Sequence, residues 1–282
     1  MQALQAQRNV EIGLQQVVAK IQSLDKKEFA SPKLYAASLH LLEKPGKLLR
    51  PALVFIGSMM LDLKEDFVDL AAAVELLHVS SLIHDDIIDN SCTRRGTEAV
   101  HVKYGTSQAL LAGDALIANA IKLAAPYGND VVSYLSSAAM AMCAGEALEI
   151  ESRPRTLRQY LQIAHLKTAS LIGASLSVTA IYAKSRLAEK LNEIGAMAGI
   201  AFQIRDDVLD YLEGEHDASH SNIIDVIYSK TRSVSQAVDE AVKINNANLR
   251  KAILLSRSIP DFPSKGLLNS YLESIKLPKE LR

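Results

Sequence analysis

The chain has 282 residues, and 49% of them are hydrophobic, which suffices to bury one large core or two small ones. Lys and Arg (31) nearly balance Asp and Glu (32), which excludes a net charge that would draw the chain to nucleic acid or an anionic membrane. The two cysteines, Cys92 and Cys143, have no CxxC spacing, so they indicate neither a disulfide framework nor a zinc site.

The first segment, residues 1–16, is polar and has no apolar signal core. The longest apolar stretch, 70–83, is interrupted by Glu75 and His78. We therefore expect no export signal, no membrane span and a cytoplasmic protein.

The structured segments of the chain are predicted to be helices. Apolar residues recur three and four positions apart over 67–89, 160–182 and 187–212, whereas the alternation typical of strands is almost absent. The eight prolines all lie between such blocks. Several blocks are apolar on more than one face, which predicts an all-α fold with central helices inside a large bundle, in one domain over 1–282. The polar stretch 213–222 predicts a mobile loop.

Two helical blocks end in the same motif, DDxxD. It comprises Asp85, Asp86 and Asp89 in the first block and Asp206, Asp207 and Asp210 in the second. At ~100° per residue each trio is expected on one helix face, where crowded carboxylates favour a bound Mg²⁺. One such motif is as well explained by a solvated acidic helix end. Two in one chain are rare by chance, so the pair predicts a metal site.

Other motifs lie around this pair in a characteristic order. They are Gly46 to Pro51 (GKLLRP), Glu75 to Asp89 (ELLHVSSLIHDDIID), Arg94-Arg95-Gly96, Gly113-Asp114, Gly145-Glu146, Lys167-Thr168, Gly199 to Asp210 (GIAFQIRDDVLD) and Lys230. In this order the sequence resembles the trans-isoprenyl (polyprenyl) diphosphate synthase family, medium/long-chain type.

The resemblance implies a single large helical bundle with a central cavity between the two aspartate-rich helices. It also implies a prenyltransferase that condenses isopentenyl diphosphate with an allylic diphosphate by a Mg²⁺-assisted carbocation mechanism. The family is usually dimeric, so a homodimer is expected and a heterodimer is possible.

The resemblance also assigns roles to single residues. The diphosphate of isopentenyl diphosphate would be held away from the metals by Lys47, Arg50, His78 and Arg95. The allylic diphosphate would be held beside Mg²⁺ by Arg94, Lys167 and Lys230. Partial negative charge would be directed at the carbocation by Thr168, Gln203 and the backbone carbonyl of Lys167.

Product length is expected to depend on Ser80 and Ser81. A tail whose diphosphate is fixed at Asp85 and Asp89 would run back along the same helix past these residues. In the family a bulky aromatic at either position closes the tunnel, whereas small residues leave it open. The two serines therefore predict an all-trans polyprenyl diphosphate longer than C20.

The chain also departs from the family pattern. Pro45 and Leu48 occupy positions that are usually Gly and Arg, and Ser229 precedes Lys230 where Gly is usual. The stretch 219–222 has lost one diphosphate-binding lysine, so the altered region 213–232 could lower activity or make it partner-dependent.

Two other functions are alternatives to a chain-elongating prenyltransferase. The first is a weakly active or regulatory subunit of a heteromeric prenyl diphosphate synthase. The intact aspartate trios argue against it, because a subunit without chemistry has no physical reason to keep crowded carboxylates. The second is a class I terpene cyclase, which normally replaces the second DDxxD and lacks the isopentenyl pocket.

Overall fold

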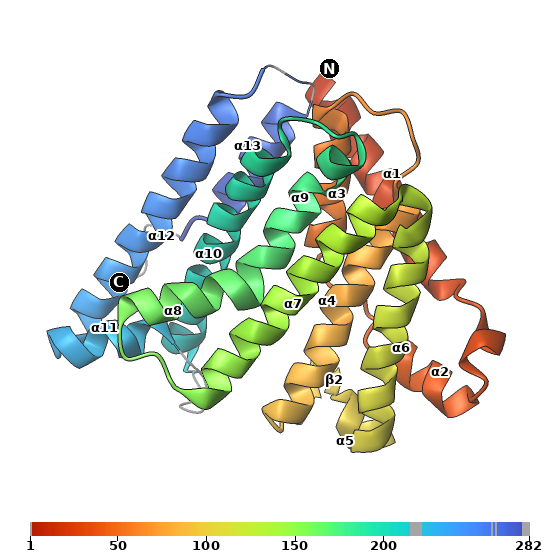
Figure 1. The fold of residues 1–282 in the computed structure, drawn as a ribbon. Helices are drawn as coiled ribbons and strands as arrows, with labels where there is room; N and C mark the ends of the chain where they lie inside the picture. Colours follow the sequence, from red (N-terminus) through yellow and green to blue (C-terminus); the bar gives the residue numbers. More distant parts are fainter. Residues whose placement is uncertain (1, 215–221, 261, 263, 278–282) are drawn as a thin grey trace.

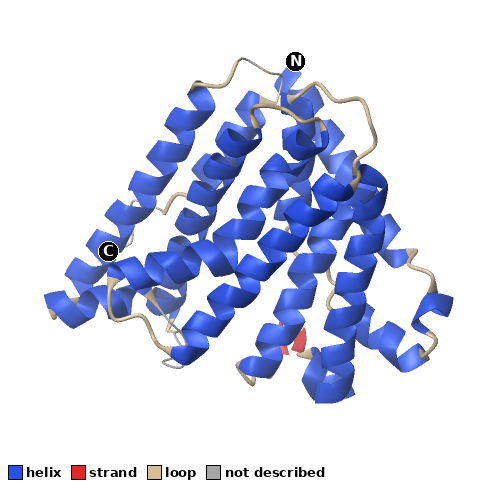
Figure 2. Ribbon diagram, viewed as in Figure 1, coloured by secondary structure: helices blue, strands red, loops and turns tan. Residues whose placement is uncertain are grey.

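The computed structural model describes residues 2–214, 222–260, 262 and 264–277. Residues 215–221, which include most of the predicted loop and most of the altered stretch 219–222, lie outside the described residues. Figure 2 shows helices throughout the described part of the chain, with one short two-stranded hairpin. The predicted all-α fold is therefore confirmed.

The described elements follow one another along the chain as labelled in Figure 1. In order they are α1 (Gln2–Gln22), η1 (Lys26–Phe29), α2 (Pro32–Leu39), α3 (Leu49–Met60), α4 (Val68–Ile88), β1 (Thr93–Arg94), β2 (Thr97–Glu98), α5 (Val100–Tyr104), α6 (Thr106–Ala124), η2 (Ala125–Tyr127), α7 (Asn129–Glu151), α8 (Leu157–Ala164), η3 (His165–Ala169), α9 (Ser170–Tyr182), α10 (Ala188–Glu213), α11 (Ile223–Thr231), α12 (Val234–Arg257) and α13 (Lys265–Ser274). The three blocks predicted from periodicity correspond to α4, to α8 through α9, and to α10.

The centre of the bundle is built from helices that are apolar on more than one face. On α9, Leu171 and Val178 join the core around α4, whereas Ile172 and Leu176 join the core between α3 and α10. On α4 every residue from Leu70 to Leu77 is buried. Such helices need neighbours on all sides, and α4 packs against α1, α3 and α6, while α9 packs against α3, α7 and α10. The bundle thereby fixes the two helices that carry the aspartate motifs.

Two described segments, Thr106–Tyr127 and Asn129–Glu151, are long and apolar enough by composition to cross a membrane. Only about a third of each is buried, because α6 and α7 contact the bundle along one side. Length and composition are weak evidence for a span, since a bundle helix passes the same test. The low buried share shows instead that each of these helices exposes part of its apolar surface.

Candidate functional site

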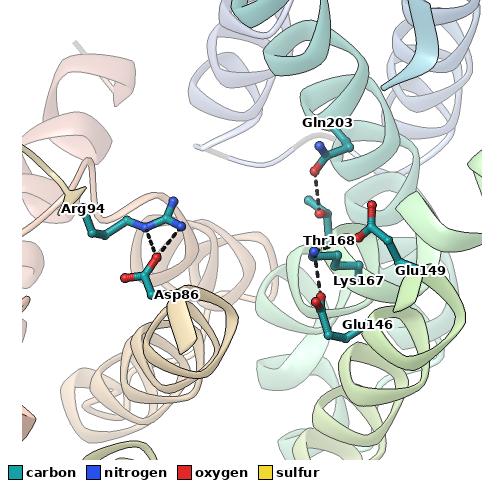
Figure 3. A network of polar contacts seen from close by, with 7 residues as sticks. All are labelled: Asp86, Arg94, Glu146, Glu149, Lys167, Thr168 and Gln203. Carbon is teal, nitrogen blue, oxygen red and sulfur yellow. Dashed lines mark hydrogen bonds and ion pairs between the residues drawn. The ribbon is translucent and has the colours of Figure 1, made fainter. Parts of the chain in front are cut away.

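The first aspartate motif lies at the end of α4, but its three carboxylates do not share one face. Asp86 is buried, and its Oδ1 accepts hydrogen bonds from Nε and Nη2 of Arg94 at 2.8 and 2.5 Å (Figure 3). Asp85 and Asp89 are partly exposed. The structure thus differs from the predicted single face, because one step of ~100° turns Asp86 away toward the hairpin.

The second motif divides in the same way. Asp207 is buried, and its Oδ2 accepts hydrogen bonds from the Tyr160 hydroxyl at 2.8 Å and the Ile223 amide at 2.9 Å. Asp206 is partly exposed and Asp210 is exposed. Here too the three carboxylates do not share the predicted single face, because the middle aspartate is hydrogen-bonded to α8 and α11.

One outer carboxylate of each motif, Asp85 and Asp206, has a raised pKa. Burial raises the pKa of Asp85 to about 7, although Lys167 and Arg94 act to lower it. Burial also raises the pKa of Asp206 to about 6, against the opposing effect of Arg205. Desolvated carboxylates of this kind fit a bound cation. Among the described residues no group of three or more His, Cys, Asp or Glu side chains converges into a metal site, so other oxygen ligands would have to complete one.

The hairpin after α4 separates its two arginines. Thr93 pairs with Glu98 and Arg94 with Thr97, so Arg95 and Gly96 form the turn. Both have positive φ, 54° and 68°, as a type I′ turn requires, and this explains the glycine. Arg95 adopts a conformation that is uncommon for residues other than glycine. The tight turn directs Arg94 to Asp86 and Arg95 to Leu41 and Glu75.

The predicted isopentenyl-binding residues Arg50, His78 and Arg95 interact electrostatically in one cluster, which we call the arginine pocket. The Nη1 atom of Arg95 donates to the Leu41 carbonyl at 3.1 Å, and its Nη2 lies 3.7 Å from Glu75 Oε1. Burial lowers the pKa of Arg50, although Glu75 acts to raise it. Burial, together with Arg50 and Arg95, holds the pKa of His78 well below its usual value, so this ring is neutral at pH 7.

Two of the three predicted lysines, Lys47 and Lys230, differ in position. Lys47 has an exposed side chain just before α3, and it lowers the pKa of Asp206. It therefore lies near the second aspartate motif. Lys230 lies in the last turn of α11 with an exposed side chain and takes no part in the polar contacts described for the site.

Lys167 lies in a π-helical turn, His165–Ala169, between α8 and α9. Its Nζ lies 2.6 Å from Glu146 Oε2 and 2.8 Å from Glu149 Oε2 (Figure 3). Burial lowers the pKa of this lysine, but Glu149, Asp85 and Glu146 outweigh it and keep the amine charged. A Cβ on Gly145 would come within 2.6 Å of the Lys167 amide, so only glycine lets α7 approach this turn. Such wide turns are frequent at functional sites.

Thr168 and Gln203 form a short chain of hydrogen bonds beside this lysine. Thr168 Oγ1 donates to Gln203 Oε1 at 2.7 Å, and Gln203 Nε2 donates to Asp207 Oδ1 at 2.8 Å. Because the side-chain N–H of Gln203 donates to Asp207, the Oε1 atom of Gln203 and the Oγ1 atom of Thr168 lie together on the side of the amide that faces away from Asp207. The π-turn and α10 therefore bring together two residues 35 positions apart in sequence.

A cavity of about 290 Å³ begins at the Asp85 end of α4 and extends between α4 and α7. Its mouth carries Asp85, Glu146 and Lys167. Both predicted chain-length residues, Ser80 and Ser81, line it, and most of the other lining residues are apolar, namely Leu77, Ile88, Ile117, Ala139, Met142, Cys143, Ala147 and Ile150, with His84 among them. From Asp85 to Leu77 is eight residues, or about 12 Å of helix. The cavity can hold an apolar chain whose polar end stays at the mouth.

Sequence reasoning missed three side chains at this site. Tyr160 lies near Asp207, Glu149 near Lys167, and Tyr271 near Arg50. The i+3 spacing of Glu149 from Glu146, on one helix face, was an available signal. The two tyrosines belong to other helices and carry no motif, so only the fold reveals them.

Known proteins resemble this chain over most of its length. The polyprenyl synthetase family model matches residues 31–256. The short chain isoprenyl diphosphate synthase of Methanocaldococcus jannaschii is 41% identical over 190 residues, which cover 64% of this chain but only 58% of that protein. The geranylgeranyl diphosphate synthase of Methanosarcina mazei is 34% identical over 265 residues, covering 86% and 82%. A solved geranyltranstransferase from the same organism has a TM-score of 0.77 at 30% identity and covers 95% of each chain.

Proposed function

This chain belongs to the polyprenyl synthetase family of prenyltransferases, and from that premise we propose that it condenses isopentenyl diphosphate with an allylic diphosphate. One observation carries the proposal. An apolar cavity has Asp85 and Lys167 at one end, and a separate cationic cluster contains Arg50 and Arg95. Each of the two charged regions can hold one diphosphate, and the cavity can hold the prenyl tail.

The metal is proposed to be Mg²⁺. Asp85 and Asp206, with Asp89 and Asp210 four residues further on, would hold it, because desolvated carboxylates favour a hard cation whose other positions go to water and phosphate oxygens. When bound, magnesium supplies electrostatic stabilisation of the departing diphosphate. The middle residues, Asp86 and Asp207, are instead proposed to orient Arg94 and Gln203.

The chain's own residues then have distinct tasks. Lys167, kept charged by its two glutamates, and Arg94, oriented by Asp86, would bind the allylic diphosphate. The oxygens of Thr168 and Gln203 would face the carbocation with partial negative charge. The apolar cavity would exclude water, which would otherwise capture the cation.

The product is proposed to be longer than C20. Support comes from Ser80 and Ser81, which leave room beneath Asp85, and from the apolar lining that continues to Leu77 and Ile117. The relatives bear the names of short-chain, geranylgeranyl, geranylfarnesyl and solanesyl enzymes, so their names alone favour no single product length.

The assembly is proposed to be a homodimer in the cytoplasm. The exposed apolar faces of α6 and α7 support an interface between copies of the chain. A regulatory subunit of a heteromeric enzyme is the alternative, and the departures from the family pattern in 213–232 favour it.

One experiment tests these proposals together. The purified protein is incubated with Mg²⁺, radiolabelled isopentenyl diphosphate and each common allylic primer, and the dephosphorylated products are sized by chromatography. We expect turnover by the single protein and products beyond C20. No turnover until a second homologous subunit is added would support the regulatory alternative instead.

A further inference from the structure

The helix α13 follows the segment that the family model matches and reaches back to the arginine pocket. It packs against α3 and α12, and it buries Leu268 and Leu272 in the core cluster between α3 and α10. Tyr271 precedes Leu272 and packs partly buried against the same cluster. The helix is thus anchored firmly enough to hold the Tyr271 hydroxyl in one place.

This hydroxyl is buried without a partner. Part of the Tyr271 ring reaches the surface, but its oxygen is inaccessible and forms no hydrogen bond to any described residue. The Nε atom of Arg50 is likewise buried and unpaired. Such groups destabilise a fold unless something satisfies them, and they are rare enough to need an explanation.

The two unsatisfied groups belong to one region. Tyr271 and Arg50 act electrostatically on each other, and Asp206 acts on both. Arg50 is also influenced by Glu75 and Arg95. Burial raises the pKa of the Tyr271 hydroxyl, so it stays protonated and can donate a hydrogen bond at neutral pH. An anion with several acceptor oxygens would satisfy both donors at once.

We propose that Tyr271 is a further substrate-binding residue, whose hydroxyl donates a hydrogen bond to the diphosphate of isopentenyl diphosphate held by Arg50. This inference rests on the proposed function, because it requires that the arginine pocket binds this diphosphate. It assigns to α13 a direct part in the reaction. A packing role alone would leave the buried hydroxyl unexplained, since phenylalanine would fill the same space.

The test is Tyr271→Phe, which removes only the oxygen. The loss of a hydrogen bond to a charged group should raise the KM for isopentenyl diphosphate roughly tenfold or more and leave the KM for the primer unchanged. In the protein without substrate, the same change removes an unsatisfied buried group, so the melting temperature should stay the same or rise. A tyrosine with a merely structural role would not give this combination.

A matched control is Tyr134→Phe. The Tyr134 hydroxyl is hydrogen-bonded to Ser177 at 2.7 Å, on α7 and away from the arginine pocket, so its loss should lower the melting temperature without changing either KM. Lys47→Ala serves as the control for the pocket itself.

The outcomes separate the two proposals. If Lys47→Ala raises the KM for isopentenyl diphosphate and Tyr271→Phe does not, the inference about Tyr271 fails while the pocket stands. If Tyr271→Phe lowers the melting temperature and raises both KM values equally, its role is structural and the inference fails as well. If neither variant affects the KM for isopentenyl diphosphate, the assignment of the pocket is wrong, and the proposed function loses its support.

Discussion

Adjacent residues of one motif can serve opposite purposes, as Asp206 and Asp207 illustrate. Burial raises the pKa of both side chains to about 6. Asp207, however, accepts hydrogen bonds from Gln203, Tyr160 and the Ile223 amide, whereas Asp206 is partly exposed beside Lys47 and Arg50. A pattern of residue types cannot distinguish them, because the difference lies in which neighbouring helix each side chain meets.

This difference predicts unequal effects of Asp207→Asn and Asp206→Asn on stability. The amide introduced by Asp207→Asn would place an N–H against groups that already donate, so we expect destabilisation of about 1–3 kcal/mol, a loss of several degrees in melting temperature. Asp206→Asn should leave the melting temperature of the metal-free protein unchanged or raise it. The measurement is thermal unfolding by circular dichroism, and equal losses in both variants would contradict the assignment.

Asp85 predicts a pH dependence of stability. Its pKa is about 7 in the folded protein, whereas an unfolded aspartate has a pKa of about 3.9. Between these values the folded state binds more protons, so the contribution of Asp85 to stability falls as pH rises from about 4 to about 7.

Asp85→Asn removes this dependence. Without metal, the variant should therefore melt above the wild type at pH 8, on the order of a few degrees, and close to it at pH 4. With Mg²⁺ at pH 8 the order should reverse, because only the wild type keeps the ligand. A difference between the two proteins that is constant with pH would show that Asp85 titrates normally.

At the scale of elements, the sequence predicted what periodicity and motifs encode. The helices α4 and α10, their terminal aspartates and the position of Ser80 beside a cavity all follow from spacing along single helices. The π-turn at Lys167 and the docking of α13 do not. They depend on contacts between distant segments, such as Gly145 against Lys167, which no local pattern specifies.

The cavity between α4 and α7 predicts the effect of Ser80→Phe. Ser80 is buried and lies five residues before Asp85, so a ring there would cross the cavity about 7 Å below the aspartate. Products should become markedly shorter while the first condensation persists. Chromatography of the products checks this, with Ser80→Ala as the control that adds no bulk. An unchanged length distribution in a folded, active Ser80→Phe enzyme would mean that the tail takes another path.

At the scale of the whole molecule, two neighbouring helices, α6 and α7, each carry exposed large apolar side chains. On α6, Leu110 and Leu111 are 51% and 48% exposed, and on α7, Met140 is 70% exposed. The two helices contact each other in the bundle. Helix α7 also forms one wall of the cavity, so a partner seated on this face would lie directly behind the proposed path of the product.

This face predicts the oligomeric state. Burying a large apolar side chain contributes about 1.5–3 kcal/mol, and a carboxylate in its place would remain unpaired in the interface. The double change Leu111→Glu and Met140→Glu should therefore convert a dimer into a monomer, measured as a halved mass by light scattering after size exclusion. Leu254→Glu is the matched control, because Leu254 is 62% exposed but lies on α12, away from α6 and α7. A dimer that survives the double change but not the control would place the interface on α12, and a monomeric wild type would remove the basis for any interface on α6 and α7.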